Sequence, residues 1–115
     1  MRSHLLLLTL LIICFSTALQ AQSSGKKGLV QGIVLDSNTE EPLSYATVTL
    51  YNATDSTLAD GAVTDDAGIF KIEASIGEYY AEIGFIGFQT QFIPDINITE
   101  DKLNYDLGTL GLSSD

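Results

Sequence analysis

Two adjacent carboxylates, Asp65 and Asp66, are the side chains of this sequence whose type and spacing most directly suggest chemistry. They stand just before Gly68, within the stretch VTDDAGIFKI at residues 63–72. Acidic residues beside a glycine can bind a metal ion, share a proton in catalysis, or cap a turn of the backbone. The residue types available elsewhere in the chain decide which of these interpretations is favoured.

Catalysis by the acid pair lacks the partner residues that it would need. Beyond residue 21 the sequence contains no histidine, cysteine or arginine, whereas a serine or cysteine nucleophile usually depends on a histidine base. For a serine–lysine dyad, Lys26 and Lys27 fall in a polar linker, and Lys71 and Lys102 fall on predicted strands. Glycoside hydrolysis by two facing carboxylates requires a cleft, for which so small a domain has little room. We therefore predict no catalytic residues and no enzymatic activity.

Metal binding is limited by the same composition. Zinc and the transition metals favour histidine and cysteine ligands, which are absent beyond residue 21. Calcium binds oxygen ligands, but the acids do not follow the spacing of a calcium loop. The alternative is a loose calcium site at one end of the domain, formed by Asp60 and the pair at residues 65–66. The favoured interpretation is solvated turn acids, with no metal and no cofactor.

The first 21 residues have the composition of a secretory signal peptide. A short positive start precedes an apolar stretch at residues 5–15, and small residues follow it. The apolar stretch is too short to span a bilayer. We expect cleavage after Ala21, with Ala18 as the alternative. A bulky residue before Cys14 disfavours a lipoprotein signal.

The remaining chain, residues 22–115, is strongly acidic. It carries four lysines against all 15 acidic residues, which is a formal charge of −11. Nucleic-acid-binding proteins carry basic surfaces that neutralise phosphate, and anionic lipid likewise attracts basic segments. The charge therefore excludes both of these partners as electrostatic targets. Without cysteine, this part of the chain cannot form a disulfide.

Alternating apolar and polar residues predict an all-β domain after a polar linker at residues 22–27. Seven strands are expected, at residues 28–36, 43–52, 57–63, 69–74, 79–85, 90–98 and 102–110. Turn residues separate them at the spacing of a sandwich. Pro94 lacks a backbone donor, which places its strand at a sheet edge or at a bulge. The expected fold is a seven-stranded antiparallel Greek-key β-sandwich over residues 28–110, followed by a tail at 111–115.

Phe70 and Ile72 are expected in the core, and the same alternation predicts which side chains share one face of a strand. These are Ala46, Val48 and Leu50; Phe70, Ile72 and Ala74; Tyr79, Ala81, Ile83 and Phe85; and Leu103, Tyr105, Leu107 and Thr109. The large side chains at Tyr79-Tyr80 and at residues 85–88 lie on both faces of one strand and its turn. The core is the favoured place for them, and a surface for a neighbouring domain is the alternative.

Three motifs in order resemble the carboxypeptidase regulatory-like domain. They are GIV at residues 32–34 with EPLSYATV at 41–48, TDDAGIF at 64–70, and the apolar strand that ends in FIGF at 85–88. The resemblance implies a seven-stranded transthyretin-like sandwich. In metallocarboxypeptidases this domain lies beside the catalytic domain and carries no zinc ligand. It therefore implies no peptidase activity for this chain.

A signal peptide followed at once by this domain resembles the N-terminal extension of TonB-dependent receptors. These are outer-membrane β-barrel proteins of Gram-negative bacteria, in which the domain lies in the periplasm ahead of a plug and a barrel. The resemblance implies an exported, non-catalytic module of the periplasm or outer membrane that contacts protein partners of the envelope, through a sheet edge or an aromatic patch. The chain is either a piece of a longer receptor or a free-standing copy. The alternative function is an exported module that binds carbohydrate or calcium.

Overall fold

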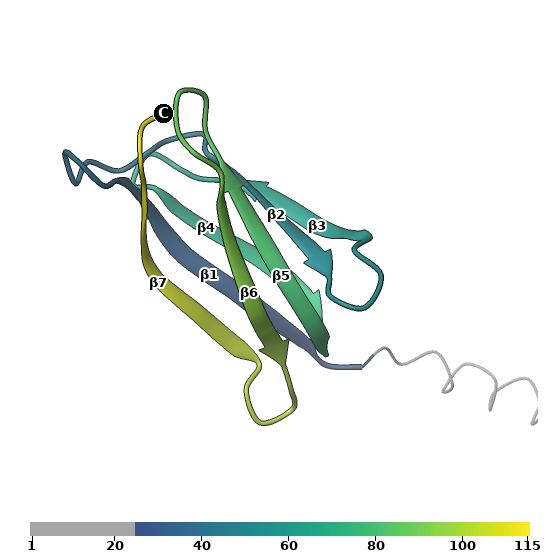
Figure 1. Ribbon diagram of the computed structural model, residues 1–115. Helices are drawn as coiled ribbons and strands as arrows, with labels where there is room; N and C mark the ends of the chain where they lie inside the picture. The colour runs from purple at the N-terminus through teal and green to yellow at the C-terminus, as the bar shows by residue number, and fades with distance from the viewer. Residues whose placement is uncertain (1–24) are drawn as a thin grey trace, which may run out of the picture.

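The structure is a computed structural model that describes residues 25–115, so the predicted signal peptide and its cleavage site lie outside the described residues. Seven strands make up this part of the chain (Figure 1). They are β1 (Lys27–Asp36), β2 (Thr47–Asn52), β3 (Leu58–Val63), β4 (Ile69–Ser75), β5 (Gly77–Gly84), β6 (Gln91–Ile98) and β7 (Asn104–Leu112). Between residues 25 and 115, no helix is long and apolar enough to cross a membrane.

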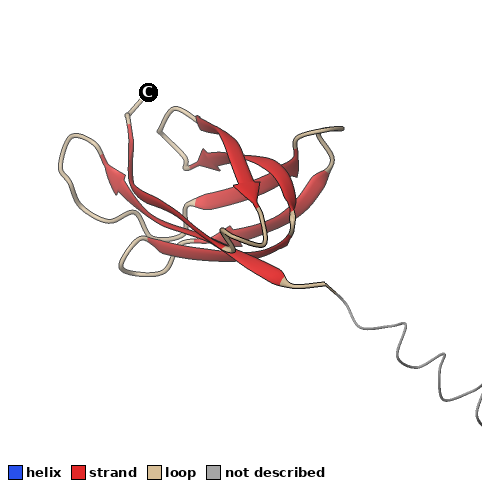
Figure 2. Cartoon of the chain, turned by 90° about the horizontal axis from the view of Figure 1, so that it is seen from below, coloured by secondary structure: helices blue, strands red, loops and turns tan. Residues whose placement is uncertain are grey.

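The strands form two sheets that lie against each other as a sandwich (Figures 1 and 2). The three-stranded sheet has the order β4-β1-β7, and the four-stranded sheet has the order β3-β2-β5-β6. The predicted all-β sandwich of seven strands is therefore confirmed.

One pairing differs from the predicted antiparallel arrangement, because β7 runs parallel to β1. The other four pairings are antiparallel. The loop between β6 and β7 returns the chain to the end of the sandwich where β1 begins, and the Leu29 amide donates to the Leu103 carbonyl at 2.7 Å. Starting beside the beginning of β1, β7 follows it in the same direction. Residue alternation predicts a strand and its two faces, but not the direction of its neighbour.

The core lies between the two sheets and receives alternate residues from both. Burial confirms the predicted core positions of Phe70 and Ile72. It also shows that the predicted shared faces are the buried ones for Ala46, Val48, Leu50, Ala74, Tyr79, Ala81 and Ile83. Four more residues of the predicted shared faces, Phe85, Leu103, Tyr105 and Leu107, are partly buried and pack against this cluster. Removal of these apolar side chains from water is the main favourable term that holds the sheets together.

The second strand begins later than predicted, at Thr47 instead of residue 43. Tyr45 has a φ of 62°, which lies in the left-handed region and interrupts an extended strand. Leu43 donates its amide to the Val34 carbonyl at 3.0 Å, so this segment bonds to the three-stranded sheet before the chain enters the four-stranded one.

A bulge in β7 corrects the prediction that Thr109 shares a face with Leu103, Tyr105 and Leu107. The pairing of β7 with β1 shifts register between Gln31 and Ile33, and Gly108 has a φ of 71° there. The extra residue reverses the alternation, so Thr109 is exposed and Leu112 is buried. The strand also continues two residues past the predicted boundary at 110.

The prediction for Pro94 is confirmed in both respects. Its strand, β6, is an edge of the four-stranded sheet. The pairing of β5 with β6 shifts register between Tyr79 and Ala81, opposite Pro94 and Asp95. A proline and a bulge both disfavour pairing with a further strand.

Candidate functional site

The acid pair that suggested chemistry is a turn between β3 and β4. Oδ1 of Asp65 accepts the amides of Ala67 and Ile69, each at 2.9 Å. Gly68 has a φ of 77°, and a Cβ added to it would lie 2.5 Å from the Val34 carbonyl oxygen. Only glycine fits both the backbone angle and the close approach. The interpretation of Asp65 as a turn cap and Gly68 as its hinge is confirmed.

The structure does not bring the other candidate calcium ligands to this turn. Oδ1 of Asp60 accepts the amide of its own neighbour, Gly61, at 2.8 Å. Asp66 is exposed. Within residues 25–115, no three acidic, histidine or cysteine side chains gather where they could hold a metal ion. The arrangement of these acids therefore lends no support to the calcium alternative.

Thr64 is a buried polar residue that the sequence analysis did not single out. It is 1% exposed, and its Oγ1 accepts the Ala46 amide at 2.9 Å while donating to the Leu43 carbonyl. The hydroxyl thus satisfies two backbone groups of a segment that has left the strand ladder. Its place in the TDDAGIF motif is the one signal that could have identified it.

The lysines do not provide a catalytic base. Lys27 lies at the start of β1, not in a linker, and its Nζ donates to Oγ of Ser75 at 3.0 Å. Both side chains are exposed, whereas a lysine becomes a base when it is desolvated. Lys71 is exposed on β4, and Nζ of Lys102 lies 4.2 Å from the centre of the Tyr105 ring.

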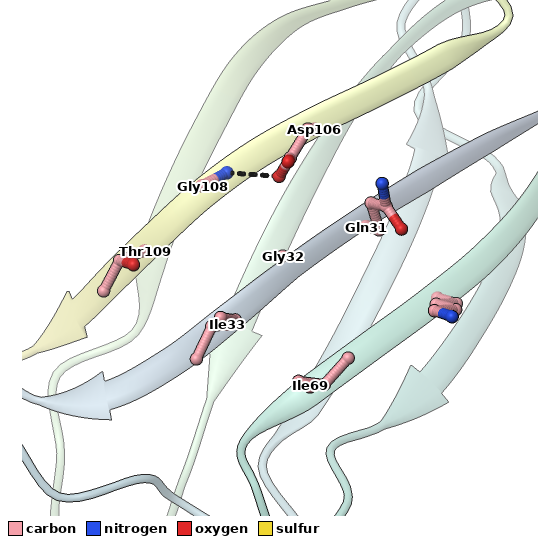
Figure 3. A pocket seen from close by; sticks show the side chains of 8 residues that line it. Gln31, Gly32, Ile33, Ile69, Asp106, Gly108 and Thr109 are labelled. Carbon is pink, nitrogen blue, oxygen red and sulfur yellow. Dashed lines mark hydrogen bonds between the residues drawn. The ribbon is translucent and has the colours of Figure 1, made fainter.

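A shallow depression of about 420 Å³ lies on the outer face of the three-stranded sheet (Figure 3). Gln31 and Ile33 of β1 line its floor, between Ile69 of β4 and Thr109 of β7. Oδ1 of Asp106 already accepts the Gly108 amide at 2.8 Å. The depression therefore presents mixed polar and aliphatic groups, among them the exposed Lys71 of β4.

The outer face of the four-stranded sheet carries a row of three aromatic rings, here called the aromatic row: Tyr51 of β2, Tyr80 of β5 and Phe92 of β6. The Tyr51 and Tyr80 rings stack with centroids 5.1 Å apart and an interplanar angle of 19°. Phe92 follows at 5.2 Å from Tyr80 and is 57% exposed. The expectation for Tyr79-Tyr80 therefore divides, because Tyr79 is core and Tyr80 is surface.

Two further aromatic side chains lie at the turn after β5. Phe85 and Phe88 contact each other edge to face at 5.6 Å and pack against the core. Ile86 between them is 96% exposed. The core interpretation therefore holds for the two rings, and the surface alternative holds for Ile86 and the aromatic row.

Charge on the four-stranded sheet has one sign. Its strands contain no lysine, arginine or histidine, and their charged residues are Asp60, Glu78, Glu82 and Asp95. In the turn between β2 and β3, hydrogen bonds from the side chain and amide of Thr57 lower the pKa of Asp55. This sheet is thus an acidic surface with an uncharged aromatic row.

Solved structures with this fold perform different tasks. The Bacillus anthracis TIE protein superposes with a TM-score of 0.65 at 18% identity, over 76% of this chain and 17% of TIE. BcpA, the major pilin subunit of Bacillus cereus, superposes with a TM-score of 0.62 at 17% identity, over 78% of this chain and 31% of BcpA. The 3-chlorocatechol 1,2-dioxygenase of Rhodococcus opacus 1CP superposes with a TM-score of 0.60 at 10% identity, over 82% of this chain and 62% of the dioxygenase. At these identities the similarity shows the fold alone.

The chain spans less than two thirds of the length of each of these proteins. No curated protein sequence matches it. The sequence model of the carboxypeptidase regulatory-like domain, in contrast, matches residues 29–108, which are most of the chain. Its three motifs form the β1–β2 segment, the Asp65 turn and the turn after β5. The chain belongs to the carboxypeptidase regulatory-like domain family.

Proposed function

We propose that this protein is a non-catalytic interaction module of the bacterial cell envelope, of the kind that precedes the plug and barrel of TonB-dependent receptors. The observation that carries the proposal is the family match over residues 29–108. The composition of residues 1–21 supports export. A module in this position acts by contact with other envelope proteins, in the periplasm or at the outer membrane.

The chemistry of the chain supports a role in binding over a role in catalysis. Residues beyond 21 supply no histidine, cysteine or arginine. The side chains of Asp65 and Thr64 are engaged in hydrogen bonds with backbone groups at the β3–β4 turn. The dioxygenase that shares the fold is 10% identical, so the likeness concerns the fold and is no evidence of that activity in this chain. The pilin that shares the fold illustrates the use of such a sandwich as an assembly subunit.

A surface that can serve in binding is present on the four-stranded sheet. Phe92 and Leu58 on its outer face are 57% and 66% exposed, respectively. Exposed apolar side chains gathered on one face are characteristic of protein interaction sites.

Two measurements test the proposal. The reading frame downstream of Asp115 should continue into a plug and a barrel. A tagged copy expressed with residues 1–115 should fractionate with the periplasm or outer membrane and should cross-link to an envelope protein. A frame that closes at once, together with a domain that cross-links to no envelope protein, would contradict the proposal.

A further inference from the structure

The outer face of the four-stranded sheet is nearly free of charge along three rows of paired residues. The first row is Leu58, Tyr51 and Tyr80; the second is Gly61, Thr49, Glu82 and Phe92; the third is Val63, Thr47 and Gly84. Residues paired across strands point to the same face, so all of these side chains face solvent. Glu82 is the one charged member of these three rows, and Glu78, paired with Asn97, adds a carboxylate beside them. In a domain of charge −11, such a face is suited to burial against another surface.

The geometry of the aromatic row favours a protein partner over a sugar. The Tyr51 and Tyr80 rings lie nearly parallel and 5.1 Å apart, so each covers a face of the other. A sugar that stacks on an aromatic ring needs an open ring face. The stack instead presents ring edges and tyrosine hydroxyls, which are the groups that tyrosine contributes to protein interfaces.

A depression beside this row shows which side chain a partner would insert. It measures about 230 Å³ and adjoins Tyr80, Phe92 and Pro94, with the carboxylates of Glu78 and Asp95 on its lining. Aromatic faces and carboxylates together attract the head group of lysine or arginine. The strands of this sheet supply no such cation themselves.

A second copy of this chain would not complement the surface. Two such sheets facing each other would bring together Glu78, Glu82 and Asp95 of each copy, and like charges opposed across an interface cost affinity. A partner that carries positive charge gains from the same groups. Charge complementarity therefore selects a basic partner over self-association.

We infer that the aromatic row docks an apolar protein segment, and that a lysine or arginine of this segment enters the depression between Tyr80, Phe92, Glu78 and Asp95. The inference rests on the proposed function, because it names the partner chemistry of the same interaction module. The apolar side chains of the segment cover the aromatic row, while its cation is held by the two carboxylates beside the rings of Tyr80 and Phe92.

Nuclear magnetic resonance titration of the isotope-labelled chain tests the inference. The probe is a synthetic peptide of alternating leucine and serine with one central arginine, and the matched probe has glutamine in place of the arginine. The arginine probe should shift the amides of Tyr51, Tyr80, Phe92 and Asn97. It should bind roughly tenfold more tightly than the glutamine probe.

A double variant, Glu78→Gln with Asp95→Asn, should abolish that difference while leaving the glutamine probe unaffected. The Asp95 carbonyl, which accepts the Tyr105 hydroxyl at 3.0 Å, is kept in this variant. The matched control, Asp66→Asn with Glu73→Gln, removes the same charge from exposed positions outside the four-stranded sheet. It should retain the preference for arginine, because only the depression is altered in the first variant.

Three results would overturn the inference: equal binding of the two probes, shifts confined to the three-stranded sheet, or no shift at millimolar peptide. They are separable from failure of the proposed function. A photo-cross-linker at position 33, on the opposite sheet, that captures an envelope protein while position 92 captures none would overturn the inference alone. No cross-link from either position would count against the proposed function itself.

Discussion

The two sheets of this sandwich use their inner faces alike and their outer faces differently. Both bury aliphatic and aromatic side chains in the shared core. Outside, the three-stranded sheet mixes signs, with Lys27 and Lys71 among the acids of its strands. The four-stranded sheet has four carboxylates, no cation and the aromatic row.

The difference separates what holds the domain together from what it presents to other molecules. Inner-face residues are protected from water and carry the stability. The aromatic row is partly exposed and lies outside the core. Its rings therefore keep unfavourable contact with water, and they add little to the free energy of folding. A mixed, charged outer face is the ordinary surface of a small domain, whereas the four-stranded sheet departs from it.

The largest expected effect comes from the inner face. Phe70→Ala removes a ring that is 2% exposed, and we expect the free energy of unfolding to fall by about 3–5 kcal/mol. Phe92→Ala on the aromatic row should cost less than about 1 kcal/mol, because only a cross-strand surface contact is lost. Urea unfolding of both variants gives the two values. Equal costs would break the distinction between a stabilising inner face and a displayed outer face.

The turn that carries the chain from one sheet to the other comes next. Gly68→Ala places a methyl group 2.5 Å from the Val34 carbonyl oxygen at a positive φ, and should cost about 2–4 kcal/mol. Gly108→Ala has a similar φ but nothing within 4 Å of the added carbon, so about 1–2 kcal/mol of backbone strain is expected. Thermal unfolding compares the two. A larger loss of stability for Gly108→Ala would show that the bulge in β7 matters more to stability than the β3–β4 turn between the sheets.

A smaller effect is expected at the buried hydroxyl of Thr64, next to the same β3–β4 turn. Thr64→Val leaves the Ala46 amide and the Leu43 carbonyl without their partner, and should cost about 1–3 kcal/mol. Thr64→Ser keeps the hydroxyl and should retain most of that stability. Chemical denaturation distinguishes the variants, and equal losses would show that the hydroxyl contributes no more to stability than the methyl group.

The smallest effect concerns the β2–β3 turn of the four-stranded sheet. Hydrogen bonds from Thr57 lower the pKa of Asp55, so their contribution is complete at neutral pH and is lost as pH falls through the lowered pKa. The Thr57 amide signal should titrate with an acidic midpoint below the usual range for aspartate. Asp55→Asn should remove this titration. A midpoint within the usual range for aspartate would show that the hydrogen bonds from Thr57 do not stabilise the charged form of Asp55.

Alternation along the chain predicted most of the fold, because burial on one face of a strand imposes a period of two on the sequence. It failed where the backbone leaves that period. The φ of Tyr45 shortens β2, and the bulge at Gly108 turns Thr109 outward. The parallel pairing of β7 with β1 does not follow from alternation.

By itself the sequence determined the inner faces, the Asp65 turn and the lack of histidine, cysteine and arginine beyond residue 21, since each depends on residue type or local spacing. Only the tertiary structure decided the outer surface. Tyr51, Tyr80 and Phe92 lie far apart in the chain and become neighbours through the pairing of β2, β5 and β6. Long-range strand order and register determine that pairing, and local sequence patterns do not encode them.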